Sequence, residues 1–394
     1  MINILRLYRR YWNIDPWRMA AYVILVLPTF ARAQFSYTIN TPDTNTVTIT
    51  HYNGSGGSVD IPSTIEGKFV TVIGPNAFYE NTNLSSVTIP DSVTEIGDWA
   101  FFGCSSLTHI TIPDNVILIR EWAFGYCTGL TNINIGNGIT SIEDNMFTRC
   151  ICLSNIEIGN SVTNIGYGAF QMCVSLASIT IPDSVTSIGS EAFRSCSSLT
   201  SVTIPNSVTD LGTWVFYECT SMTNARIGNG VRILGEYLFN GCSNLLNINI
   251  SASVTNISAE AFFRCYAIVG YYLSSDSPPS LTGSGWLYYG TNAVVYRLSD
   301  ATGWPAVPAP WGGQPTAFWL PKVADDECLG VQEGQFGFNV DWADSKTVVV
   351  EACTNLFATN WVTVATNTLT NGTAYFHDPQ WTNILCRFYR LRSQ

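Results

Sequence analysis

The 394-residue sequence is poor in the residues that most enzymes and nucleic-acid-binding proteins depend on. It has three histidines, His51, His109 and His377, and no Gly-rich phosphate loop, zinc motif or nucleophile elbow. Charged residues make up 12% of the chain, and the net charge of −11 repels phosphate backbones. The sequence therefore predicts neither an enzyme nor a nucleic-acid-binding protein, and we expect no cofactor.

Long apolar runs are also scarce, apart from one near the N-terminus. Residues 20–27 form an apolar core that is too short to span a bilayer, and several arginines precede it. Ala31-Arg32-Ala33 is a small-x-small cleavage pattern, which makes Gln34 the first mature residue. We expect residues 1–33 to be a signal peptide, with no membrane span in the mature chain. The alternative is a buried N-terminal helix.

The main feature that the sequence does contain is a repeat of 23 residues. Phe stands three residues before each repeated position, and Leu, Met or Ile stands three residues after it. We call the repeated position zero and each copy a coil; a fixed period of this length indicates a stacked architecture. Asn81 holds position zero in the first copy, and cysteine holds it in the next eight: Cys104, Cys127, Cys150, Cys173, Cys196, Cys219, Cys242 and Cys265.

Each coil is predicted to contain a short strand, a stop and a turn. Positions six and eight, such as Val87 and Ile89, alternate with polar residues and indicate a strand with one buried face. Pro or Gly then ends the strand. Ala100, Phe101 and Cys104 have helical spacing, so a short helical turn is expected. One coil cannot bury its apolar side chains alone, so the coils are expected to stack with parallel strands.

Segment 86–107, SVTIPDSVTEIGDWAFFGCSSL, resembles the BspA-type bacterial leucine-rich repeat. Segment 61–70 resembles the usual first coil of that family, and the resemblance spans about residues 35–275. It implies a repeat solenoid with parallel strands and short helical turns. It also implies a bacterial protein, secreted or on the cell surface, that binds other molecules and performs no chemistry.

The sequence divides into six segments. Prolines and three tryptophans, Trp304, Trp311 and Trp319, mark the exit cap, although a ligand platform is the alternative for these rings. Longer alternating runs from Gln335 predict a small all-β sandwich that resembles modules appended to bacterial surface proteins. The segments are the signal peptide (1–33), the N-terminal cap and first coil (34–80), the 23-residue repeats (81–275), the C-terminal cap (276–320), a linker (321–334) and the small β-sandwich (335–394).

The cysteines at position zero are predicted to form a buried thiol ladder. Their side chains all point into the core, and free Cys is among the most buried residue types. Metal is not expected, because a ladder does not bring ligands to one point; sporadic disulfides remain the alternative. Cys152 is out of register and should face outward. In the C-terminal module Cys353 and Cys386 are a possible disulfide, with Cys328 as the rival partner of Cys353.

Two faces of the coils could meet a partner. The outward strand positions are polar and nearly uncharged, which is typical of a solvated sheet. The outer side of the turn carries aromatic residues, and exposed rings are enriched at binding surfaces; the alternative is that these rings half bury one another. The predicted partner-binding residues are Tyr79, Trp99, Phe102, Trp122, Tyr126, Trp214, Tyr217 and Tyr237.

Two functions remain open from the sequence. The first is an exported, non-enzymatic, monomeric leucine-rich repeat protein that binds protein or glycan through an extended repeat face. The alternative is a structural envelope scaffold, in which the repeats are a spacer and the C-terminal module attaches.

Overall fold

The computed structural model describes residues 34–283, 292–324, 329–332, 335–354, 361–370, 372–378 and 387–394. The predicted signal peptide and Cys328 and Cys386 lie outside these residues. The described residues form two compact units, which divide between Ser161 and Val162.

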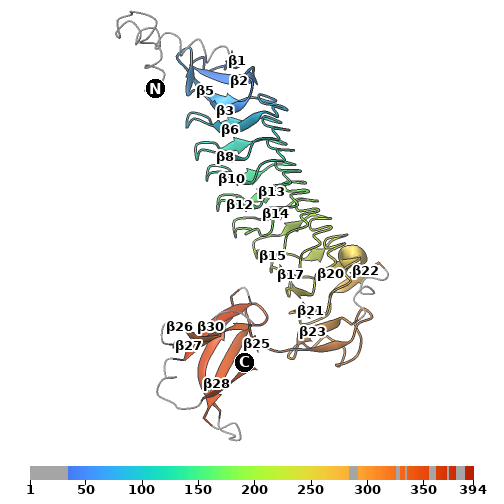
Figure 1. The fold of residues 1–394 in the computed structure, drawn as a ribbon. Helices are drawn as coiled ribbons and strands as arrows, with labels where there is room; N and C mark the ends of the chain where they lie inside the picture. The colour runs from blue at the N-terminus through green and yellow to red at the C-terminus, as the bar shows by residue number, and fades with distance from the viewer. Residues whose placement is uncertain are drawn as a thin grey trace, which may run out of the picture. The chain divides into compact units, whose positions relative to one another are not determined.

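The first unit stacks its coils through parallel strands (Figure 1). Its first sheet has the order β1-β2-β5-β7-β9, with β4 paired to β5, and its second has the order β12-β10-β8-β6-β3. Ile110, Ile133 and Ile156 are directly paired, so each coil advances one strand. The strands are β1 (Phe35–Ile39), β2 (Thr46–Tyr52), β3 (Gly57–Asp60), β4 (Thr64–Ile65), β5 (Lys68–Ile73), β6 (Leu84–Thr88), β7 (Glu95–Ile96), β8 (His109–Thr111), β9 (Leu118–Ile119), β10 (Asn132–Asn134), β11 (Ser141–Ile142) and β12 (Asn155–Glu157).

The second unit begins with the same arrangement. The outward-facing strands form one parallel sheet in the order β15-β17-β19-β21-β23-β24, so β23 and β24 extend the repeat sheet beyond Tyr272. The elements are β13 (Asn164–Ile165), β14 (Ser187–Ile188), β15 (Ser201–Ile204), β16 (Asp210–Leu211), β17 (Asn224–Ile227), β18 (Ile233–Leu234), β19 (Asn247–Ile250), β20 (Asn256–Ser258), η1 (Ala259–Phe262), β21 (Gly270–Leu273), β22 (Ser280–Thr282), β23 (Val294–Leu298) and β24 (Thr316–Trp319).

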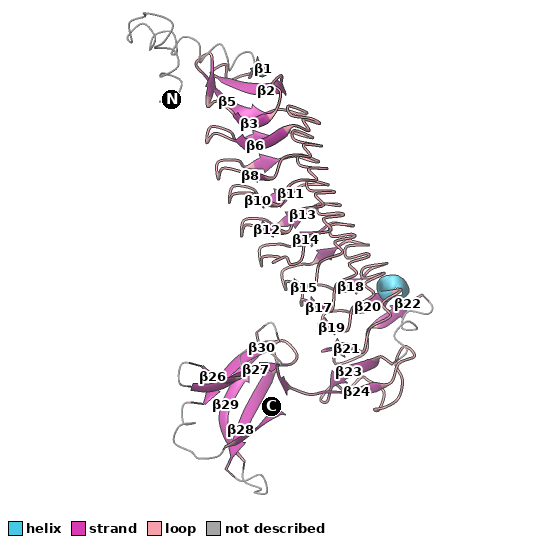
Figure 2. Cartoon of the chain, in the orientation of Figure 1, coloured by secondary structure: helices cyan, strands magenta, loops and turns pink. Residues whose placement is uncertain are grey.

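The C-terminal module of the second unit consists of two antiparallel sheets (Figure 2). One centres on β27, which pairs with β25, β26 and β30, and the other has the order β29-β28-β31. Phe338, Val340 and Phe376 are buried, whereas the strand neighbours Asn339 and Tyr375 are more exposed, as the period-two pattern predicts. The strands are β25 (Lys322–Val323), β26 (Gly330–Gln332), β27 (Gln335–Asp341), β28 (Thr347–Cys353), β29 (Val362–Thr368), β30 (Thr373–Asp378) and β31 (Phe388–Ser393).

A stack of phenylalanine rings fills the core of each unit. In the first unit the Phe101 and Phe124 ring centroids are 5.4 Å apart at an interplanar angle of 3°, and Phe147 follows 5.7 Å beyond. This spacing is close to the distance between neighbouring strands, because one coil adds one strand and one ring. Tyr52 ends the stack by lying 5.1 Å from Phe78. In the second unit the stack runs Phe170, Phe193, Phe216, Phe239 and Phe262, and Tyr271 closes it edge-on.

The turn before position zero differs from the expected helical turn. Within the described residues the one helix is η1, a short 3-10 helix. Elsewhere alternate amides of one coil donate to carbonyls of the next coil, as strands would, and the amides between them bond three residues back. In the Cys104 coil the intercoil bonds are Trp99 to Glu121 (3.1 Å), Phe101 to Ala123 (2.8 Å) and Gly103 to Gly125 (2.9 Å).

Left-handed backbone at two positions explains this turn. In a continuous helix every amide would donate its hydrogen bond within its own coil. A residue with positive φ instead reverses the chain, so that the next amide points toward the neighbouring coil. Positive φ recurs one residue before position zero, for example at Gly103 and Tyr126. It also recurs five residues before it, at Asn76, Trp99, Trp122, Asn145, Gly168, Glu191, Trp214 and Tyr237.

We predict that Phe124→Ala destabilises the protein by about 3–5 kcal/mol, the usual cost of deleting a fully buried ring. Phe124 is fully buried between Phe101 and Phe147, so no neighbour can close the cavity without breaking the stack. Urea unfolding followed by circular dichroism measures the loss. Phe69→Ala is the control, since Phe69 is 56% exposed. Equal effects of the two changes would contradict the ring stack as the source of stability.

Candidate functional site

The aromatic residues predicted to bind a partner fall on the left-handed turn positions or beside them. Trp99, Trp122, Trp214 and Tyr237 each stand five residues before position zero with φ between 58° and 61°. Bulky side chains are uncommon in this conformation, whereas Asn and Gly adopt it readily. Asn76 and Asn145 hold the same position in other coils of the first unit. The backbone therefore needs no ring at these sites.

Five rings form one cluster on the turns of the first unit. Trp99 stacks on Trp122 with centroids 4.9 Å apart, and Tyr79 stacks on Phe102 at 5.3 Å. Phe102 joins the two pairs, because its ring also lies 4.6 Å from Trp99 and 5.0 Å from Tyr126. Tyr79 and Tyr126 are 40% and 37% exposed, and the other three rings are half-buried. The rings partly bury one another and still present a continuous aromatic surface, which we call the Trp99 cluster.

The second unit carries a smaller cluster of three half-buried rings, the Trp214 cluster. Trp214 lies 4.3 Å from Tyr237 and 4.8 Å from Tyr217. The Arg194 guanidinium lies 5.1 Å from the Tyr217 ring centroid and is also bonded to Glu191 at 2.8 Å. The structure thus brings the eight predicted residues into two groups, one in each unit.

A polar groove on the strand face of the second unit was missed by the sequence analysis. Its floor consists of outward side chains of β15, β17 and β19, and its wall includes Tyr272 and Trp319. Lys322 and Asp341, at the start of the C-terminal module, complete it. The groove has a volume of about 260 Å³. Strands that are far apart in the sequence supply its sides, and this is why a scan along the chain does not find it.

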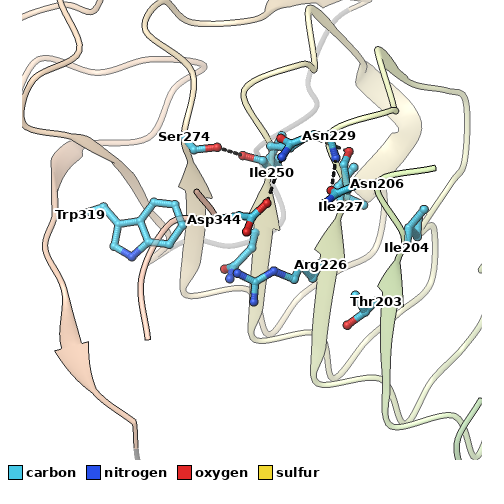
Figure 3. Close-up of a pocket in the computed structure, with 13 residues that line it drawn as sticks. Thr203, Ile204, Asn206, Arg226, Ile227, Asn229, Ile250, Ser274, Trp319 and Asp344 are labelled. Atoms are coloured by element: carbon cyan, nitrogen blue, oxygen red, sulfur yellow. Dashed lines mark hydrogen bonds between the residues drawn. The ribbon is translucent and has the colours of Figure 1, made fainter. Parts of the chain in front are cut away.

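Arg226 lies where the repeat sheet meets the C-terminal module (Figure 3). Its Nη2 atom donates to the Trp342 carbonyl at 3.5 Å. Arg226, Asn229 and Asp344 together line a smaller cavity of about 20 Å³. Asn229 Nδ2 donates to Asp344 Oδ2 at 3.0 Å, which ties the turn after β17 to the module (Figure 3). The guanidinium also packs on Gly372, where any Cβ would overlap it.

Burial sets the electrostatics around the groove. It lowers the pKa of Arg226, and the carboxylates of Asp341 and Asp344 act in the opposite direction. Burial also raises the pKa of Asp341, while Lys322, 3.7 Å away, and Arg226 oppose the rise. Arg226 was visible in the sequence as the one basic residue of its outward strand column, between Thr203 and Asn249. This basic residue between uncharged neighbours in its column is the signal by which the sequence could have indicated the site.

The cysteines at position zero lie in the core of each unit and donate to backbone. Cys127 Sγ donates to the Phe101 carbonyl of the preceding coil at 3.1 Å, and the same carbonyl accepts the Cys104 amide at 3.2 Å. All eight are at most 1% exposed, whereas Cys152 is exposed. Burial raises the pKa of the Cys104, Cys196 and Cys265 thiols to about 12, so these side chains stay protonated and can donate.

Comparison with known proteins identifies the repeat. The model of the BspA type leucine rich repeat region, in six copies, matches residues 51–177 and 163–277. The chain belongs to the BspA-type leucine-rich repeat proteins. The resemblance inferred from segment 86–107 is therefore confirmed. No curated protein matches the chain.

Several solved leucine-rich repeat structures are similar to this BspA-type protein. The T. pallidum leucine-rich repeat protein is 30% identical over 60% of this chain and 88% of its own, with a TM-score of 0.32. A leucine rich cell surface protein from Faecalibacterium prausnitzii is 27% identical over 64% of this chain and 94% of its own, with a TM-score of 0.31. A leucine-rich repeat protein from Bacteroides ovatus is 23% identical over 68% and 94%, with a TM-score of 0.40.

The remaining predictions for this leucine-rich repeat protein concern a disulfide, a metal site and a membrane span. Cys353 is buried in β28, but Cys386 lies outside the described residues, so the disulfide between them stays a prediction. The described residues contain no group of three or more His, Cys, Asp or Glu side chains that could hold a metal ion. In the same part of the chain, no helix has both the length and the apolar character needed to cross a membrane.

We predict that the thiols at position zero do not react with Ellman's reagent in the native protein. Each is buried, and the thiolate that reacts is disfavoured by the raised pKa. Cys152 is exposed and should react at once. Counting released thiolate for the wild type and for Cys152→Ser, before and after unfolding in guanidinium, measures both. Fast native labelling of Cys127 or Cys219, mapped by mass spectrometry, would contradict the buried ladder.

Proposed function

We propose that this protein is an exported, non-enzymatic leucine-rich repeat protein that acts as a monomer and binds a protein or glycan partner through its turn face. The Trp99 cluster is the proposed contact surface in the first unit, and the Trp214 cluster is its counterpart in the second. Membership of a family of repeat proteins supports binding rather than catalysis. The observation that supports this proposal most directly is that large rings occupy backbone positions that favour Asn or Gly.

The energetics of those positions support a role for the rings beyond folding. A left-handed conformation costs an L-residue other than Gly, Asn or Asp about 1–2 kcal/mol. One aromatic pair such as Trp99 and Trp122 returns about 0.5–1.5 kcal/mol beyond its burial. Trp99 and Trp122 make four such ring contacts in all, so their stacking returns about as much as the left-handed backbone costs and leaves no clear surplus for folding. Asn76 and Asn145 show that the same chain forms this turn elsewhere with a residue that suits the left-handed backbone. A partner that covers the rings accounts for their presence.

Export supports the same function. Residues 1–33 have the pattern of a signal peptide, and a similar solved structure is that of a leucine rich cell surface protein. We therefore propose that the mature chain is secreted or displayed on a bacterial surface, where an aromatic contact surface meets external protein or glycan.

We predict that the double variant Trp99→Asn, Trp122→Asn loses partner binding without losing stability. Asn removes both rings but suits the left-handed backbone, as it does at residues 76 and 145. The thermal midpoint should stay level or rise, and affinity for a partner selected on arrays of extracellular proteins and glycans should fall at least about tenfold, as expected for hot-spot aromatics.

Two control variants make this test specific. Trp99→Phe, Trp122→Phe keeps rings and should keep most of the binding, whereas Trp214→Asn, Tyr237→Asn removes the rings of the second cluster alone. If neither Asn variant weakens capture of the selected partner, the aromatic turn face is not the binding surface. If capture falls only in parallel with a lower thermal midpoint, the rings serve stability instead.

Export gives a separate expected outcome. When the full chain is expressed in a bacterium with a general secretion pathway, the mature protein should begin at Gln34, because Ala31-Arg32-Ala33 precedes it. N-terminal peptide mass spectrometry of the exported protein measures this. A retained Met1, or a protein found only in the cytoplasm, would contradict export.

A further inference from the structure

The groove on the strand face of the second unit has the size of a site for one small ring. Its volume of about 260 Å³ lies just below the range of about 300–1,000 Å³ for sites that take drug-sized ligands. It is partly open to solvent, so a ring at the end of a longer chain can enter while the rest remains in solvent.

The floor of the groove is a row of uncharged hydrogen-bonding side chains. Asn224, Asn247 and Asn249 provide amides, and Ser201 and Thr203 provide hydroxyls. Asn247 Nδ2 donates to Asn224 Oδ1 at 3.4 Å, and Asn224 Nδ2 donates to Thr223 Oγ1 at 3.1 Å. An amide offers both donors and acceptors, and a ligand hydroxyl also does both. A polyhydroxylated ligand matches this floor better than one with a single polar end.

Tyr272 supplies an aromatic wall beside that floor. Its ring stacks on Tyr296 at 4.7 Å and meets Trp319 edge-on at 5.2 Å, so its orientation is held from two sides. The ring lies over Gly270: a Cβ there would be 2.6 Å from the ring and 3.0 Å from Asn247 Oδ1. The missing side chain thus lets an apolar ring face and an amide oxygen lie next to each other. The C–H face of a sugar ring packs on an aromatic ring such as Tyr272, and its hydroxyls bond to an amide such as that of Asn247.

The charges around the groove cancel. Arg226 and Lys322 are balanced by Asp341 in the groove and by Asp344 in the adjoining cavity. Lys322 and Asp341 are 3.7 Å apart, and Arg226 is opposed by both carboxylates. No net field attracts an anion or a cation, so the site suits an uncharged ligand.

We infer that this groove binds a single neutral hexose unit at the end of a glycan. The amide and hydroxyl floor bonds the ring hydroxyls, and Tyr272 packs on the C–H face. Arg226 from β17 and Asp341 from β27 orient the ring at the end of the groove next to the module. The inference does not rest on the aromatic turn face, so the site is independent of the Trp99 cluster.

The test uses methyl glycosides of glucose, galactose and mannose as probes with the intact mature chain. Saturation-transfer NMR and calorimetric titration should show binding of at least one glycoside, with a dissociation constant on the order of 1 mM, as an open groove with few contacts implies. The double variant Asn247→Ala, Asn249→Ala should weaken binding at least about tenfold, because about two hydrogen bonds are lost. Tyr272→Ala should weaken it as well, and Tyr272→Phe should not.

Asn132→Ala, Asn134→Ala is the matched control. These residues occupy the same two strand columns in β10 but do not line the groove, so binding should be unchanged. Absence of saturation transfer from all three glycosides would overturn the inference. So would equal losses in the two Asn double variants, or preferential binding of methyl glucuronide or of a zwitterionic amino acid. The variant Trp99→Asn, Trp122→Asn should keep glycoside binding, which separates failure of this site from failure of the proposed turn-face function.

Discussion

Backbone hydrogen bonds from one coil to the next are the constraint on which this protein depends. The strands use them in the ordinary parallel manner, but the turns use them as well: alternate amides such as that of Phe101 leave their own coil and reach the Ala123 carbonyl. Each coil must then have the same length and the same turn geometry as its neighbours. A period of 23 residues without insertion is the chemical consequence.

The cysteine at position zero follows from the same constraint. The Phe carbonyl three residues earlier lies in a dry core and accepts two bonds, one from its own coil and one from the thiol of the next. The site therefore favours a small, apolar side chain with one donor. Serine would meet the geometry, but its hydroxyl costs more to bury, and alanine would leave the second lone pair unused. Burial at the same time keeps the thiol protonated, so the ladder is structural and its reactivity is suppressed.

The two proposed binding sites arise where the repeat departs from what its backbone requires. Trp99 and Trp122 stand in a left-handed conformation that Asn, present at residue 145, adopts more readily. Arg226 and Tyr272 stand on one strand column, which carries mainly Thr and Asn in the other coils. In the first case the departure concentrates rings on the turns. In the second it creates a groove, since the last coils meet the C-terminal module through Asn229 and Asp344.

The sequence by itself determined the solenoid, its parallel strands and the residues of its core, because a strict period forces equivalent side chains into one environment. Phe124, Cys150 and Leu130 could be placed from spacing alone, and the family could be inferred from nine copies in register. The predicted helical turn was wrong in detail. The helical spacing of Ala100, Phe101 and Cys104 does not show that alternate amides of this turn donate hydrogen bonds to the next coil. Only the tertiary structure decided that the aromatic residues separate into two clusters. It alone placed Lys322 and Asp341 opposite Asn247, because no local pattern records which distant segments come to lie side by side.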